Sequence, residues 1–172
     1  MKTWPSLIAM FIEQAQILGE NPYLWAKKDG KYESVTWKKT SETALALARG
    51  LKTLGIKKGD RILLCSESRP EWIMAYYAIM AAGGIVVPAY TTNTQSDHAH
   101  IISDSGAKGV IVSSKELAEN LVPAAHKTGN VTFIVAIDEI EFSQSSGIDI
   151  LDWKSLVEGG RETPDNLSEY IS

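Results

Sequence analysis

The residues best suited to bind a ligand are a tyrosine and two threonines, Tyr90, Thr91 and Thr92. They follow the apolar run Ile85–Pro88, which is typical of a buried strand, and they precede Thr94, which can cap a helix. In open α/β sheets, ligands bind in the crevice beyond the carboxyl ends of the strands. Two hydroxyls and a phenol offer hydrogen bonds there without a buried charge. The segment is therefore a candidate substrate-binding site, and the alternative is a plain βα turn in which the tyrosine only packs.

Three acidic residues are also expected near the carboxyl ends of strands. Glu71 and Asp97 complete segments of the form Ser-x-x-Glu and Thr-x-x-Asp, and helix capping explains both. Glu67 is left as a candidate acid or base, with no further support in the sequence. We therefore predict no catalytic residue in this chain.

Histidine and cysteine positions predict neither a metal centre nor a nucleophile. His98 and His100 are two residues apart, so their side chains point about 200° apart on a helix and cannot hold one ion without further ligands. We expect one exposed and one half-buried histidine. Cys65 is the single cysteine and ends the apolar run Arg61–Cys65, so we predict a buried small hydrophobe. With no disulfide available within the chain, a reducing compartment is favoured.

The composition is that of an ordinary globular protein, and it excludes several functional classes. Hydrophobic residues make up 44% and charged residues 22% of the 172 residues. The net charge is −4 and the basic residues form no concentrated run, which argues against nucleic-acid binding. No stretch of about 18 apolar residues suits a transmembrane segment. Without a convincing signal peptide, we expect a cytoplasmic protein.

The first 59 residues predict a helix, a hairpin and a second helix. The first helix is predicted over 3–18, with Thr3 as its cap and Gly19 at its end. The pair Asp29-Gly30 lies between two strand-like runs and favours a type I′ turn. The second helix is predicted over 38–54. The apolar stripe of the first helix is expected to comprise Leu7, Met10, Phe11, Gln14 and Leu18, with the glutamine as a polar exception.

Residues 60–137 alternate between strand-like and helical segments. Four apolar strands begin about every 24 residues, the length of one strand and one crossover helix. Such strands suit a parallel sheet covered on both faces, so we predict an α/β fold with a doubly wound, mainly parallel sheet and flanking helices. Residues 138–172 predict a loop-rich tail, with a short strand and helix in Ile150–Val157 and a polar end from Arg161. The expected caps of the three connecting helices are Ser68, Thr94, and Ser113 or Ser114.

Three stretches resemble the amino-terminal region of AMP-forming acyl-CoA synthetases, members of the adenylate-forming enzyme superfamily. The first runs from Val35 to Arg61 and includes Lys58-Gly59-Asp60-Arg61. The second is Ser66–Trp72. The third is Met80–Thr94, which includes the loop Tyr90-Thr91-Thr92-Asn93, followed by Ile102–Lys108. The second and third stretches are most similar to the long-chain fatty-acid–CoA ligase branch. Lys39 departs from the pattern, since relatives often carry Glu at this position.

The resemblance implies a ligase that forms an acyl-adenylate and then an acyl-CoA, with fatty acid, ATP, Mg²⁺ and CoA as partners. The glycine- and Ser/Thr-rich loop ending in Pro-Lys-Gly, which holds the ATP phosphates in that family, is absent from these residues, as is the C-terminal domain with its catalytic lysine. Residues 1–172 are therefore expected to be a partial N-terminal domain, inactive alone and without tight cofactor binding. Tyr90, Thr91 and Thr92 are expected to line the channel for CoA or the acyl group.

Two other classes of protein stay open. One is a stand-alone flavodoxin-like or receiver-like binding module, which has similar length and strand spacing. A receiver needs an acidic cluster after its first strand and an aspartate after its third, where this chain has Cys65–Ser68 and Ser113. The other class is a purely structural interaction domain. Homo-oligomerisation and peripheral contact with a membrane also stay open, and the sequence does not indicate the acyl chain length.

Overall fold

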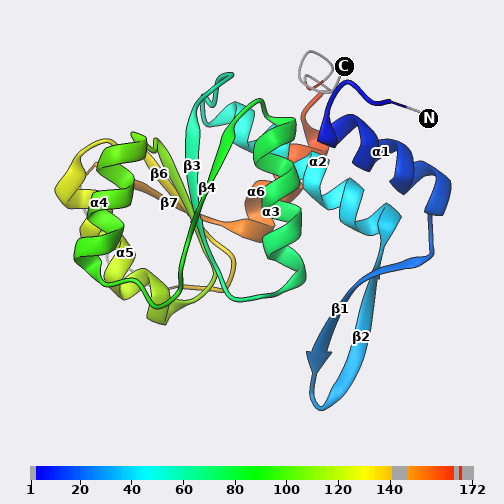
Figure 1. Ribbon diagram of the computed structural model, residues 1–172, viewed down its shortest axis with the longest axis horizontal. Coiled ribbons are helices and arrows are strands. Elements are labelled where there is room, and N and C mark those ends of the chain that lie inside the picture. Colours follow the sequence, from blue (N-terminus) through cyan, green and yellow to red (C-terminus); the bar gives the residue numbers. More distant parts are fainter. Residues whose placement is uncertain (1–2, 141–146, 165–166, 168–172) are drawn as a thin grey trace.

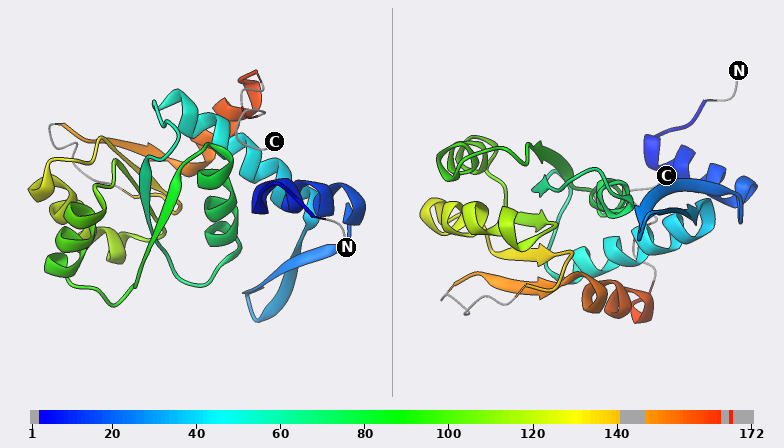
Figure 2. Two further views of the ribbon diagram at one scale, coloured as in Figure 1. Left: turned by 45° about the horizontal axis from the view of Figure 1, so that its top comes forward. Right: turned by 90° about the horizontal axis from the view of Figure 1, so that it is seen from below.

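A computed structural model of the chain describes residues 3–140, 147–164 and 167. A five-stranded parallel sheet lies between two sets of helices (Figures 1 and 2). A two-stranded antiparallel hairpin stands apart from this sheet and projects from the body (Figure 1). The predicted α/β class, with its parallel sheet, flanking helices, N-terminal helix and hairpin, is confirmed.

The N-terminal segment contains four elements, α1 (Leu7–Leu18), β1 (Pro22–Lys28), β2 (Lys31–Thr36) and α2 (Trp37–Thr53). Asp29 and Gly30 join β1 to β2 with φ of 48° and 80°. Both angles are positive, as a type I′ turn requires, so the predicted turn is confirmed. Gly19 ends α1, also as predicted.

The predicted start of α1 is wrong, and its predicted buried stripe is right at Phe11 but wrong at Leu7. Ser6 rather than Thr3 caps the helix, because the Ser6 hydroxyl accepts a hydrogen bond of 3.1 Å from the Ala9 amide. Leu7 is 44% exposed, whereas Ile8, Phe11 and Ala15 are buried. The physical reason is that α1 is apolar around most of its circumference, so its own periodicity cannot select one face. Packing selects it, through the Phe11 ring stacked 3.7 Å from Tyr77.

The parallel sheet has the order β4-β3-β5-β6-β7. Its strands are β3 (Arg61–Cys65), β4 (Ile85–Ala89), β5 (Gly109–Val112), β6 (Phe133–Ala136) and β7 (Asp149–Asp152). The helices are α3 (Pro70–Ala81), α4 (Gln95–Ser105), α5 (Lys115–Thr128) and α6 (Trp153–Glu162). Helices α2, α3 and α6 cover one face of the sheet, and α4 and α5 cover the other (Figure 2). The sheet is therefore doubly wound.

Each central strand contributes alternate side chains to two separate cores. Ile62 and Leu64 of β3 pack with α2 and α3, whereas Leu63 and Cys65 pack with the side of α4 and α5. The alternation follows from the strand geometry, in which successive side chains point to opposite faces. Because both faces are covered, the strands read as continuous apolar runs, which is why the sequence predicted a parallel sheet.

Helix caps agree with the sequence prediction at two of the three connecting helices. Thr94 and Asp97 form a full capping box on α4, and Ser114 caps α5 through the Leu117 amide. The predicted cap at Ser68 is wrong. α3 begins after Arg69 without a side-chain cap, with Pro70 in its first turn. Proline already has a helical φ and removes one of the unpaired amide hydrogens at the helix start, which favours this start without a side-chain cap.

The polar end predicted from Arg161 is also wrong in part, because α6 continues to Glu162 and Leu167 is buried. α6 packs tightly on α2, where the Arg49 Nε donates a 2.6 Å hydrogen bond to the Gly160 carbonyl oxygen. The predicted strand and helix after residue 149 are confirmed as β7 and α6. Most of the predicted Ser-rich loop, residues 141–146, lies outside the described residues, as do 165–166 and 168–172.

Candidate functional site

The loops that follow the strands gather at one edge of the sheet, because all five strands run in the same direction. The chain passes from β3 to β4 on one side of β3, then crosses to β5 on its other side. The direction of winding therefore reverses between β3 and β5. Open α/β sheets bind their ligands at such a reversal, beyond the carboxyl ends of the strands.

A cleft with a volume of about 480 Å³ opens at this edge, beside the ends of β3 and β4. Tyr90 and Thr91 line it, and the Tyr90 side chain is 81% exposed. Thr92 is exposed but is not among the lining residues. The remaining lining residues are Ser66, Glu67, Ser68, Trp72, Pro88 and Ala89. Two of the three residues predicted from the sequence thus border one cleft.

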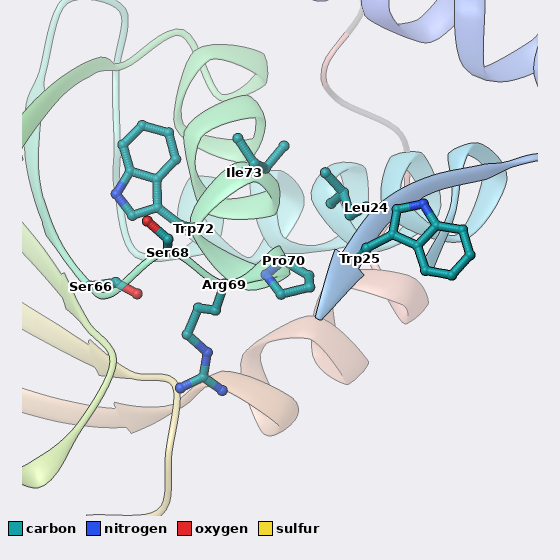
Figure 3. Close-up of a pocket in the computed structure, with 8 residues that line it drawn as sticks. All are labelled: Leu24, Trp25, Ser66, Ser68, Arg69, Pro70, Trp72 and Ile73. Atoms are coloured by element: carbon teal, nitrogen blue, oxygen red, sulfur yellow. The ribbon is translucent and has the colours of Figure 1, made fainter. Parts of the chain in front are cut away.

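A second hollow, of about 380 Å³, adjoins the cleft along the loop that follows β3. Ser66, Ser68 and Trp72 line both spaces. Figure 3 shows that the second hollow lies between β1, which supplies Leu24 and Trp25, and the start of α3. A largely apolar hollow therefore connects the hairpin with the carboxyl edge of the sheet.

A carboxylate and two hydroxyls meet at the point of reversal. Ser113 donates a short hydrogen bond to one Glu67 oxygen, and Ser114 donates to the other at 3.4 Å. Partial burial alone would raise the pKa of Glu67, but these hydrogen bonds and the nearby Arg69 charge outweigh it and hold the pKa below its usual value. Glu67 is therefore ionised at neutral pH, so it can accept a hydrogen bond or a proton but cannot act as an acid.

Arg69 fixes the loop that carries Glu67. Its Nε donates to Glu71 at 2.8 Å, and its Nη1 donates to both oxygens of Asp138 at 2.9 and 3.1 Å. Asp138 lies just beyond the end of β6, so this clamp joins loops that are 69 residues apart. The sequence predicted that Glu71 belongs to a capping box, but its carboxylate binds Arg69 instead.

The amino end of α4 already carries a negative charge. Asp97 accepts hydrogen bonds from the Thr94 amide at 2.9 Å and from the Thr94 hydroxyl at 2.8 Å. These bonds lower the pKa of Asp97, which keeps it ionised. An anionic ligand group at this helix end would meet that charge, so the hydroxyls before α4 suit a neutral ligand group better.

Cys65 and His98 are structural residues. The Cys65 thiol is buried and donates to the Tyr90 carbonyl oxygen at 3.8 Å, and burial raises its pKa to about 11. It therefore stays protonated and is a poor nucleophile. His98 is fully buried, not half-buried as predicted, and burial lowers its pKa. His100 is exposed.

Replacing Ser113 with alanine is expected to raise the pKa of Glu67. The substitution removes the strongest hydrogen bond to the ionised carboxylate while leaving its partial burial in place. An NMR titration of the Glu67 side-chain carboxyl carbon measures the change. Ser103→Ala, at an exposed position on α4, is the matched control. Equal Glu67 titration curves in all three proteins would show that the Ser113 contact does not govern this carboxylate.

Residues 3–140, 147–164 and 167 include no group of three or more His, Cys, Asp or Glu side chains placed to hold a metal ion. Within the same ranges, every helix is too short or too polar to cross a lipid bilayer.

The fold defines an α/β protein with a cleft at the carboxyl edge of its sheet. Counted from β3, the strand order is 2-1-3-4-5, the order of flavodoxin-like folds, so topology alone does not separate the sequence-based alternatives. Comparison with known proteins separates them. The AMP-binding enzyme family matches residues 11–168, and the chain belongs to this family. The predicted resemblance to adenylate-forming enzymes is confirmed.

Curated relatives include long-chain fatty-acid–CoA ligases. The ligase FadD15 of Mycobacterium tuberculosis is 30% identical over 123 residues, which are 72% of this chain and 20% of the relative. The ligase ACSBG1 of Rattus norvegicus is 23% identical over 162 residues, which are 94% of this chain and 22% of the relative. The chain therefore spans about a fifth of the length of these relatives.

Solved structures show the same fold. The A-PCP didomain of a carboxylic acid reductase from Segniliparus rugosus, in complex with AMP, has a TM-score of 0.79 at 16% identity, covering 98% of this chain and 28% of that structure. The anthranilate CoA ligase AuaEII, in complex with anthranoyl-AMP, has a TM-score of 0.78 at 19% identity, with coverage of 92% and 29%.

Proposed function

We propose that this chain is the amino-terminal part of an ATP-dependent ligase that converts long-chain fatty acids into acyl-CoA through an acyl-adenylate. The observation that carries the proposal is the family match over residues 11–168, together with curated relatives that are long-chain fatty-acid–CoA ligases. ATP and CoA are soluble cofactors, and Cys65 is a free buried thiol, so we place the protein in the cytoplasm.

In this proposal, residues 1–172 form part of the wall of the channel for CoA or the acyl group, and they do not bind the ATP phosphates. Glu67 and Asp97 put negative charge at the carboxyl edge, which repels phosphate and carboxylate groups. Tyr90, Thr91 and Thr92 offer neutral donors and acceptors. Such a surface suits the amide groups in the arm of CoA, or the uncharged part of an acyl chain.

Formation of an acyl-adenylate needs cations and backbone donors around the developing phosphate charge. The sequence contains no Gly- and Ser/Thr-rich loop ending in Pro-Lys-Gly. We therefore expect other parts of the parent enzyme to form the ATP and Mg²⁺ site, and residues 1–172 alone to have no ligase activity.

The test compares pyrophosphate release and CoA-dependent turnover in the full-length parent enzyme, using ATP, Mg²⁺ and fatty acids of several lengths. We expect release from the parent and none above a heat-killed control from residues 1–172. Thr91→Ala and Thr92→Val in the parent should weaken CoA-dependent turnover roughly tenfold, the loss of one or two hydrogen bonds, and leave adenylation unchanged.

Thr132→Val is the control for these variants, since Thr132 is exposed at the opposite end of the sheet, next to the start of β6. A parent enzyme without fatty-acid-dependent pyrophosphate release would refute the ligase assignment. Equal kinetics of the Thr91, Thr92 and Thr132 variants in both half-reactions would refute the channel role alone.

A further inference from the structure

The β1–β2 hairpin carries two large aromatic side chains that the described part of the chain leaves uncovered. Trp25 is 59% exposed and Tyr32 is 72% exposed. Trp25 pairs with Ser34 and Lys27 pairs with Tyr32, so these four side chains share one face of the ribbon. The two aromatic residues are diagonal neighbours there, with a lysine beside them. The face thus combines aromatic rings with a positive charge.

The tip of the hairpin is a local concentration of positive charge on an acidic chain. Residues 27–31 contain three lysines, Lys27, Lys28 and Lys31, and one aspartate, for a formal charge of +2. The whole chain has a net charge of −4, which leaves −6 for the remaining residues. All three lysine side chains are exposed. An anionic surface would therefore attract the hairpin tip and repel the rest of the molecule. The protein would then approach such a surface with its hairpin first.

The hairpin is held firmly at its base and projects from the body at its tip (Figure 1). At the base, the Tyr23 ring stacks on Trp37 of α2 with the ring centres 3.6 Å apart. The Tyr23 hydroxyl also lies 3.2 Å from the Tyr77 hydroxyl of α3. The tip can thus meet a flat surface without any rearrangement of the sheet.

We propose that the face formed by Trp25, Lys27 and Tyr32, with Lys28 and Lys31 at the tip, docks on the anionic phospholipid surface of a membrane. Trp and Tyr side chains are enriched at the headgroup level of bilayers. Their rings are largely apolar but carry one polar group that can hydrogen-bond to water. Lysines near an anionic surface each add to the attraction. An interface with another protein is less suited to this face, because lysine is depleted at the centre of such interfaces.

The position of the hairpin links the docked surface to the cleft. Leu24 and Trp25 line the apolar hollow that shares Ser66, Ser68 and Trp72 with the cleft at the carboxyl edge. Docking would therefore place the mouth of this hollow at the bilayer, where long-chain fatty acids partition. This link rests on the proposed function, whereas the docking itself does not.

The test is co-sedimentation of the 172-residue chain with vesicles, without ATP or CoA, so that its outcome is independent of ligase activity. Vesicles of phosphatidylcholine with phosphatidylglycerol are compared with vesicles of phosphatidylcholine alone. We expect at least about tenfold stronger partitioning to the anionic vesicles, decreasing as salt is raised. Trp25→Ala with Tyr32→Ala should reduce it about tenfold, and so should Lys27→Glu with Lys28→Glu.

The matched control is Lys57→Glu with Lys58→Glu, in the turn between α2 and β3, at the end of α2 that is far from the hairpin (Figure 1). It changes the net charge by the same amount, and it should retain most of the binding. Circular dichroism checks that every variant is folded. Absence of binding, equal binding to both vesicle types, or equal losses in the two lysine pairs would overturn the proposal. A hairpin variant that instead dissociates an oligomer would assign the face to a second copy of the chain and overturn it equally.

Discussion

Gly160→Ala is expected to destabilise the protein by about 3 kcal/mol and to lower its melting temperature by roughly 10 °C. Gly160 lies on α6 where this helix crosses α2. A methyl group at this position would lie 1.9 Å from the Ala46 carbonyl oxygen and 3.0 Å from the Gly50 amide nitrogen. Both are backbone atoms inside a helix and cannot move aside, so α6 must move away. That movement also breaks the 2.6 Å hydrogen bond from Arg49.

The neighbouring residue provides the control. Gly159 lies on the same helix, is exposed, and has no atom within 4 Å of an added methyl group. Gly159→Ala should therefore stabilise the protein by up to about 1 kcal/mol, since alanine favours a helix over glycine. Thermal and urea unfolding followed by circular dichroism give both values. A Gly160→Ala protein as stable as the Gly159→Ala protein would show that α6 does not pack on α2.

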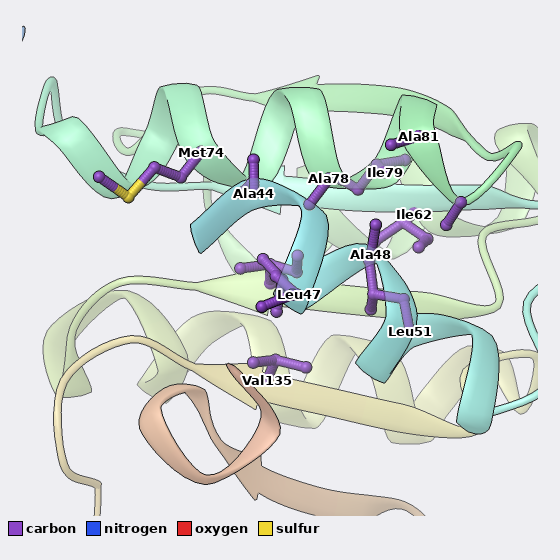
Figure 4. Packing of buried hydrophobic residues seen from close by; sticks show 14 of the residues in the cluster. Ala44, Leu47, Ala48, Leu51, Ile62, Met74, Ala78, Ile79, Ala81 and Val135 are labelled. Atoms are coloured by element: carbon purple, nitrogen blue, oxygen red, sulfur yellow. The ribbon is translucent and has the colours of Figure 1, made fainter. Parts of the chain in front are cut away.

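Leu47→Ala is expected to cost about 3 kcal/mol of unfolding free energy, within the usual range of 2–5 kcal/mol for a buried leucine. Leu47 has no exposed surface and belongs to the core between α2, α3 and the sheet. Figure 4 shows its side chain on α2 between α3 and Val135 of β6. The substitution leaves a cavity surrounded by strands and helices that cannot collapse into it. The urea midpoint should fall without a change in the slope of the transition.

Ile17→Ala removes an equal number of carbon atoms from an exposed site and is the matched control. Ile17 is 66% exposed on α1, so its truncation should change stability by about 0.5 kcal/mol or less. A loss at Leu47 no larger than that at Ile17 would contradict the core described here. A loss accompanied by a lower slope would instead point to a change in the compactness of the unfolded chain.

The candidate site was only partly predictable, because its residues come from loops far apart in the sequence. Tyr90 and Thr91 were found because they directly follow a strand, and the loop after any strand of a parallel sheet lies at the same edge. Glu67 was noted for the same reason, but its partner Ser113 was not. Their contact requires β3 and β5 to be neighbours, although β4 lies between them in the chain.

The sequence by itself determined the elements of this protein and its family. Apolar runs, the Asp29-Gly30 turn and the caps at Thr94 and Ser114 are local signals, since hydrogen bonds and side-chain periodicity within a few residues create them. Where local signals were ambiguous, the prediction failed, as at the apolar helix α1 and before Pro70. A single helical period cannot select one face of a helix that is apolar around most of its circumference.

Only the tertiary structure decided which elements are neighbours. The order β4-β3-β5-β6-β7, the clamp between Arg69 and Asp138, and the packing of α6 on α2 all depend on contacts between residues distant in sequence. Such contacts form because the two faces of the sheet and the apolar stripes of the helices must be buried together. That condition applies to all of these elements at once. The same condition leaves Trp25 and Tyr32 uncovered on the hairpin, which no pattern along the chain reveals.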